Sequence, residues 1–148
     1  MPKNYLIGFC CLICECVFAA ELSPFRSDGC SVFPDGTRAE QQLWRRCCIT
    51  HDVAYWKGGT VSERRSADDA LQSCVSKLGE PSVGLVMLLG VRVGGSPFWP
   101  TPFRWGYGWP YPRAYGPLTE TEQQQVEATL QLASFQVDSL DDPFWFAF

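Results

Sequence analysis

The chain has 148 residues, of which 46% are hydrophobic and 19% charged, a composition typical of a globular protein. This length is enough for one domain with a modest core and too short for two full domains. The formal net charge of -4 excludes an overall basic surface of the kind that binds nucleic acid, and we therefore expect no nucleic-acid partner.

Residues 1–19 are expected to be a signal peptide. Lys3 precedes a mostly apolar run interrupted by Glu15, and the run ends in small residues with a plausible cleavage site after Ala19. The alternative is a buried or membrane-spanning helix, but the run is short for a span and a glutamate in lipid would be costly. We therefore predict a secreted or periplasmic protein whose mature chain has no transmembrane segment.

Cysteine content changes when this leader is removed, because four of the eight cysteines go with it and four remain: Cys30, Cys47, Cys48 and Cys74. An even number in an exported domain predicts two disulfides. One of the three pairings joins the neighbours Cys47 and Cys48 in a strained ring, so two pairings stay open. A zinc site made of Cys30, Cys47, Cys48 and His51 is the alternative, but export favours disulfides.

Residues 21–37 are expected to be extended or looped, because prolines and glycines interrupt them. From Arg38 onwards, apolar residues recur at three- and four-residue intervals, which predicts a first helix. This helix should end at Gly58 and Gly59.

A second helix is predicted to begin at Thr60, because Thr60 and Glu63 have the spacing of a capping box. It should run through Cys74 and end near Gly79 and Pro81. Two helices joined by so short a turn must run antiparallel.

The apolar stretch 83–93 is interrupted by glycines and by Arg92, and it covers only about half of a bilayer core if helical. We expect a buried helix or strand there, with an interfacial helix as the alternative. Residues 97–113 are dense in aromatic residues, glycine and proline, and cannot form a regular helix. They either close the core as a loop or form an apolar lip suited to a water–lipid boundary.

Near the C-terminus, Thr119 and Glu122 form another capping box, which predicts a polar helix to about Ala133 followed by an acidic and aromatic tail. The expected organisation is therefore a main domain over residues 20–117 and a helix with a tail over residues 118–148.

His51 is the single histidine of the chain and lies beside Asp52 in the first predicted helix. Their side chains should point about 100° apart, toward two neighbouring parts of one site. A histidine can take a proton from water near neutral pH. Asp52 could hold a cation whose other ligands are Asp28 and the carbonyl of Gly29, and such hard oxygen ligands suit Ca2+.

The antiparallel arrangement can be tested against this chemistry. If Cys47 faced Cys74, one helical turn forward from Cys47 would reach His51, and about a turn and a half back from Cys74 would reach Asp68. We therefore favour Asp68 over Asp69 as the carboxylate that accepts the imidazole N–H. A bridge between the other two cysteines would hold the Asp28–Gly29 loop beside Asp52. The assembled site predicts an ester hydrolase in which histidine activates water directly.

These residues resemble the secreted phospholipases A2. The segment Cys-Cys-Ile-Thr-His-Asp-Val-Ala-Tyr at residues 47–55 is similar to the family's active-site pattern C-C-x-x-H-D-x-C-Y, with Ala54 in place of the cysteine of the animal enzymes. Asp28-Gly29-Cys30-Ser31 with Pro34-Asp35 resembles the calcium loop of the bacterial and fungal branch. Asp68, six residues before Cys74, is similar to the second catalytic aspartate.

The resemblance implies a mainly α fold in which two antiparallel, disulfide-linked helices carry the active site behind a calcium-binding loop. It also implies Ca2+-dependent hydrolysis of the sn-2 ester of glycerophospholipids at a phospholipid membrane surface. The implied roles are His51 as general base with Asp68 as its partner, Asp52, Asp28 and Gly29 as calcium ligands, Tyr55 as a site-lining residue, and bridges Cys30–Cys48 and Cys47–Cys74.

The resemblance covers residues 28–74, and residues 83–148 match no part of the family. The glycine-rich calcium loop of the animal enzymes is absent, and their β-hairpin has no room between the helices. A second hypothesis is therefore a non-catalytic, exported, calcium-stabilised module that binds lipid or protein through residues 97–113. The presence of both His51 and Asp68 favours the enzyme, since a binding scaffold needs neither.

Overall fold

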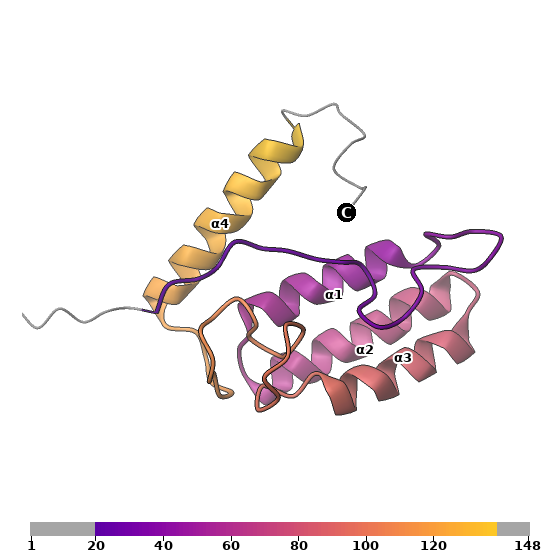
Figure 1. Ribbon diagram of the computed structural model, residues 1–148, viewed down its shortest axis with the longest axis horizontal. Helices are drawn as coiled ribbons and strands as arrows, with labels where there is room; N and C mark the ends of the chain where they lie inside the picture. Colours follow the sequence, from indigo (N-terminus) through magenta and orange to yellow (C-terminus); the bar gives the residue numbers. More distant parts are fainter. Residues whose placement is uncertain (1–19, 139–148) are drawn as a thin grey trace, which may run out of the picture.

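The computed structural model describes residues 20–138, and within this range the chain forms four helices and no strand (Figure 1). The helices are α1 (Arg45–Lys57), α2 (Val61–Lys77), α3 (Pro81–Gly94) and α4 (Glu120–Asp138). The mainly α fold class expected from the sequence is thus confirmed. The predicted signal peptide and most of the predicted C-terminal tail lie outside the described residues.

Three of the helices form one layer in which α2 lies between α1 and α3 (Figure 1). Helix α1 ends where the sequence predicts, because Gly58 and Gly59 adopt φ values of 69° and 135° that favour glycine. A Cβ on Gly58 would also lie 2.9 Å from the Cα of Gly106, so the chain passes closely here. The sharp turn sends α2 back antiparallel to α1.

Helix α2 begins with the predicted capping box. The Thr60 hydroxyl accepts the backbone N–H of Glu63, and the Glu63 carboxylate accepts the backbone N–H of Thr60 at 2.7 Å. These hydrogen bonds hold the pKa of Glu63 below its usual value. The start of α2 is therefore fixed by local sequence.

Helix α1 begins at Arg45, so the prediction of a helix from Arg38 was wrong. The preceding residues form turns, because Trp44 is hydrogen-bonded to the upstream loop. Its backbone N–H donates to the carbonyl of Asp35 at 3.0 Å, and its indole N–H donates to the carbonyl of Pro34 at 2.6 Å. With the ring only 3% exposed, burial of Trp44 outweighs the helical periodicity before it.

The core has two parts. The first surrounds both disulfides and contains Trp44, Leu71, Val75 and Met87 as well as the four cysteines. The second joins the N-terminal segment to α4 and contains Leu22, Trp56, Trp109 and Val126. The first part therefore supports α1, which carries His51, together with α2 and α3.

The stretch 83–93 forms helix α3, with Pro81 at its first turn, but it is buried on one face only. Gly84 packs against α2 so closely that a Cβ there would lie 2.8 Å from the carbonyl oxygen of Gln72. The opposite face is exposed and uncharged, which corrects the expectation of a buried element. Its large apolar residues are Leu85, Val86, Leu89 and Val93.

The aromatic segment 97–113 is irregular, as predicted, and divides into two parts. Trp105 and Trp109 are buried, and their indole N–H groups donate to the carbonyls of Gly59 and Lys57 at the end of α1. Phe98, Trp99 and Tyr111 are exposed. The buried rings therefore close the core as a loop, which was one of the two interpretations, whereas a role of the exposed rings at a water–lipid boundary stays a prediction.

Helix α4 stands apart from the three-helix layer in Figure 1 and packs on the N-terminal segment. The side-chain oxygen of Gln125, on α4, accepts the backbone N–H of Leu22 at 3.1 Å. The predicted capping contacts between Thr119 and Glu122 are present, and the helix continues to Asp138 rather than ending near Ala133.

Candidate active site

The two disulfides join Cys30 to Cys48 and Cys47 to Cys74. This pairing is the one implied by the family resemblance, and it excludes the zinc site because the sulfur atoms bond to each other. One bridge ties α1 to α2, and the other ties the upstream loop to α1. Both bridges leave from neighbouring residues of α1, one turn before His51.

His51 lies beside Asp68, with its Nε2 at 3.1 Å from the Asp68 Oδ1. Asp68 is fully buried, whereas the Asp69 side chain is 61% exposed and contacts Arg92 instead. The structure thus places the favoured aspartate, and not its neighbour, next to the histidine. The roles of general base and partner stay predictions.

The tautomer of His51 follows from this contact. With Asp68 as a carboxylate, the contact is a hydrogen bond only when the imidazole proton is on Nε2, which leaves the lone pair on Nδ1. The ring is only 7% exposed, but it forms part of a cavity wall and stacks against Tyr55 with centroids 4.2 Å apart. Nδ1 is therefore the nitrogen available to a molecule in the cavity.

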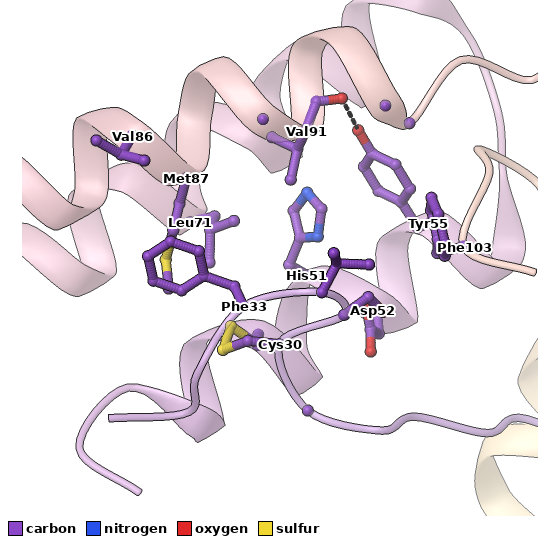
Figure 2. Close-up of a pocket in the computed structure, with 17 residues that line it drawn as sticks. Cys30, Phe33, His51, Asp52, Tyr55, Leu71, Val86, Met87, Val91 and Phe103 are labelled. Atoms are coloured by element: carbon purple, nitrogen blue, oxygen red, sulfur yellow. Dashed lines mark hydrogen bonds between the residues drawn. A yellow bond between two sulfur atoms is a disulfide. The ribbon is translucent and has the colours of Figure 1, made fainter. Parts of the chain in front are cut away.

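Tyr55 fixes Asp68 from the same helix as His51. Its hydroxyl donates to the Asp68 Oδ1 at 2.7 Å and also lies 3.3 Å from the carbonyl of Val91 (Figure 2). Burial raises the pKa of Tyr55, so the phenol stays a proton donor at neutral pH. Tyr55 is thus placed as a site-lining residue, as the sequence indicated.

Two arginines that sequence reasoning did not include complete the surroundings of Asp68. The Nε of Arg92 lies 2.9 Å from the Asp68 Oδ2, in an ion pair without the alignment of a hydrogen bond. The Nε of Arg64 donates to the Tyr55 hydroxyl at 3.0 Å. One signal was visible in the sequence, since Arg92 is the single charge in the apolar stretch 83–93.

Asp52 occupies a part of the site where negative charge gathers. Burial raises its pKa to about 7, the Ser27 hydroxyl lowers the pKa by donating a hydrogen bond, and Asp28 and Asp35 raise it by repulsion. The Ser27 hydroxyl lies 2.6 Å from the Asp52 Oδ2. A cation would relieve this charge, so the surroundings of Asp52 suit Ca2+.

The loop residues are placed unequally. Gly29 lines the same cavity as Asp52, whereas Asp28 lines a neighbouring groove and accepts the Ser31 hydroxyl at 2.8 Å. Within residues 20–138 no three acidic, histidine or cysteine side chains converge as a metal site. A calcium ion beside Asp52 would therefore need carbonyl and hydroxyl oxygens of the loop as further ligands.

Gly29 has a conformational reason for its identity. Its φ is 86°, and a Cβ would lie 2.4 Å from the Oδ1 of Asp35. That carboxylate accepts the backbone N–H of Cys30 at 2.8 Å and so shapes the loop. The sequence resemblance included Asp35 in the loop without giving it a role, and the structure shows that it accepts a hydrogen bond within the loop.

Asp52 should make stability depend on pH when calcium is chelated. Its folded-state pKa is about 7 against an ordinary 3.8, so the folded protein retains a proton that the unfolded chain has lost. The free energy of unfolding should therefore fall between about pH 4 and pH 7, by at most about 4 kcal/mol. Urea denaturation in chelator at pH 5 and pH 8 measures this, with Asp52→Asn as the comparison. An equal fall in Asp52→Asn would contradict it.

A cavity of about 410 Å³ opens beside His51, between the loop, α1 and α3 (Figure 2). Its polar members are few, and most of its wall is apolar. The apolar side chains shown around it include Phe33, Leu71, Val86, Met87, Val91 and Phe103. A groove of about 660 Å³ adjoins it, sharing Ser31 and Phe103, and is lined by serines, Arg26 and Asp28.

Comparison with protein-family models, curated proteins and solved structures finds no match to this chain. The chemistry of the site therefore follows from its own residues. A buried carboxylate contacts a histidine, a second carboxylate in negative surroundings follows the histidine in α1, and an apolar cavity adjoins both.

Proposed function

We propose that this protein is a secreted, Ca2+-dependent hydrolase of the phospholipase A2 type, which cleaves the sn-2 ester of glycerophospholipids. The observation that carries the proposal is the orientation of His51. Its Nε2 is bound to the buried Asp68, and its ring lines the apolar cavity together with Asp52. This arrangement supports activation of a water molecule next to an apolar substrate.

In the proposed reaction, water held at Nδ1 of His51 attacks the ester carbonyl while the imidazole takes its proton. Asp68 stabilises the imidazolium through Nε2–H, and the imidazolium then protonates the leaving alkoxide. Asp52, with oxygens of the Ser27–Gly29 loop, would hold Ca2+. When bound, the ion supplies positive charge for the developing oxyanion.

The cavity supports a substrate with an acyl chain. Apolar groups from three elements, Phe33, Leu71 and Met87 among them, line it beyond His51. A volume of about 410 Å³ falls within the range of small-molecule sites and suits part of a fatty chain. Polar substrates would gain little there, because burying an unpaired polar group is costly.

The test is release of fatty acid from mixed phospholipid vesicles by the oxidised chain, with calcium and with chelator. We expect release in calcium and none in chelator. Absence of release in both conditions, from protein shown to be folded with both disulfides formed, would refute the enzyme and favour the binding module.

The proposed location rests on the two disulfides, which form in oxidising compartments outside the cytosol. Among the helices of residues 20–138, none is long and apolar enough to cross a membrane. Secretion itself is part of the proposal, and cleavage near Ala19 can be checked by N-terminal sequencing of the exported protein.

The exposed face of α3 is our proposed contact with the membrane surface. Val86 on this face also lines the cavity, and across from it Val32 is 92% exposed with a φ of 60°, an unusual conformation for a β-branched residue. Apolar side chains thus border the cavity from two elements. A phospholipid could move from the bilayer into the cavity along them.

Leu89→Glu should weaken binding to phospholipid vesicles by about 10- to 100-fold, because a Leu that enters the bilayer contributes about 1.5–3 kcal/mol. Leu89 does not line the cavity, so hydrolysis of a soluble short-chain ester should be unchanged. Leu132→Glu on α4 is the matched control, since Leu132 is 70% exposed and Leu89 60%. Sedimentation with vesicles measures binding, and equal loss in both variants would contradict the proposed face.

A further inference from the structure

Both oxygens of the buried Asp68 carboxylate have defined neighbours. Oδ1 accepts the Tyr55 hydroxyl at 2.7 Å and lies 3.1 Å from His51 Nε2. Oδ2 faces Arg92, whose Nε is 2.9 Å away. Since Asp68 is fully buried, an oxygen of its carboxylate left without a partner would be costly, and Arg92 is the neighbour that faces Oδ2.

The guanidinium of Arg92 is itself held in place by α2. Its Nη2 donates to the Asp69 Oδ1 at 2.7 Å and to the carbonyl of Arg65 at 3.2 Å. The carbonyl of Arg92 in turn accepts an N–H of the buried Arg64 at 2.9 Å. Arg92 therefore reaches Asp68 from α3 in a fixed orientation.

We propose that Arg92 is a positioning residue, which pairs with Oδ2 of Asp68 and so holds Oδ1 toward Nε2 of His51, where it accepts the imidazole N–H. The catalytic meaning of this role rests on the proposed function, because only the hydrolase needs a free lone pair on Nδ1. The geometry itself does not depend on activity. The family resemblance ends at Cys74, so it assigns no role to Arg92.

Loss of the guanidinium should loosen the contact between Asp68 and His51. Oδ2 would be left buried without a partner, so the carboxylate would no longer be held with Oδ1 toward Nε2 of His51. Without a fixed acceptor at Nε2, the imidazole proton would be shared between Nε2 and Nδ1, and a ring with its proton on Nδ1 cannot take one from water at that nitrogen. Arg64 does not replace Arg92, since it reaches Asp68 through the hydroxyl of Tyr55.

The single histidine of the chain makes the test direct, because 15N–1H NMR resonances of the imidazole belong to His51 alone. At a pH where the ring is neutral, we expect Nε2–H in the wild type and a substantial share of Nδ1–H in Arg92→Gln. Arg92→Lys keeps the charge and should keep the wild-type tautomer. Asp69→Asn is the matched control, since it removes the charge of the exposed partner of Arg92 while its amide oxygen can still accept Nη2–H, and it should leave the tautomer unchanged.

A folded Arg92→Gln with both disulfides and the wild-type tautomer would overturn the proposal. If the hydrolase is active, Arg92→Gln should lower kcat about 10²-fold or more with KM within about twofold, because a misplaced proton removes the base while Arg92 does not line the cavity. A tautomer shift in a protein that hydrolyses nothing would support Arg92 and refute the hydrolase. The two proposals can thus fail separately.

Discussion

Replacing His51 with glutamine is expected to lower kcat for phospholipid hydrolysis by about 10²- to 10⁴-fold, because the variant has no group that takes a proton from water. The amide N–H of glutamine can still donate to Asp68, so the surroundings of the buried carboxylate should survive. Fatty-acid release from vesicles in calcium measures the loss, and urea denaturation measures the stability.

Asp69→Asn is a suitable control for this experiment, because it alters a neighbouring carboxylate that does not contact His51. Its activity should stay close to that of the wild type. Substantial hydrolysis by a pure, folded His51→Gln protein would show that another residue activates water, and the proposed mechanism would have to be abandoned.

Removal of the Cys47–Cys74 bridge by a double serine substitution should lower the free energy of unfolding by several kcal/mol. The bridge spans 27 residues, and constraint of the unfolded chain by a loop of this size contributes about 3.5 kcal/mol. Further loss is expected from the core, where these sulfur atoms pack with Leu71 and Val75. Thermal and urea denaturation would measure both.

The Cys30–Cys48 bridge provides the comparison, because it spans 18 residues and contributes about 3 kcal/mol by the same reasoning. Its loss should mainly free the Asp28–Gly29 loop from Asp52 and weaken calcium binding, which isothermal titration calorimetry would detect. Calcium affinity equal to that of the wild type in both double-serine variants would show that neither bridge shapes a calcium site.

The start of α2 and the end of α1 could be predicted because their signals are local. The capping residues Thr60 and Glu63 and the glycine pair at residues 58–59 act within a few residues of the helix ends. The contact between His51 and Asp68 could also be predicted, because helical spacing and one assumed bridge, Cys47–Cys74, were enough to bring the two residues together.

What escaped prediction depends on contacts between distant residues. The start of α1 is set by Trp44 binding the carbonyls of Pro34 and Asp35, and no pattern near residue 38 indicates this. The sequence of residues 83–93 did not decide between a helix and a strand. Composition alone also does not say which face of this stretch packs against α2. Arg92 looked like an interruption of that stretch and proved to be an ion-pair partner of Asp68.

Helix α1 carries an unusual share of the constraints on this protein. Of its 13 residues, the buried ones are Cys47, Cys48, His51, Tyr55 and Trp56, and both disulfides start there. Nearly every turn of α1 therefore holds a residue whose substitution would disturb packing in another part of the fold. Substitutions should therefore be tolerated on the exposed side of α4 and at exposed positions of α1 such as Thr50 far more readily than at these buried positions.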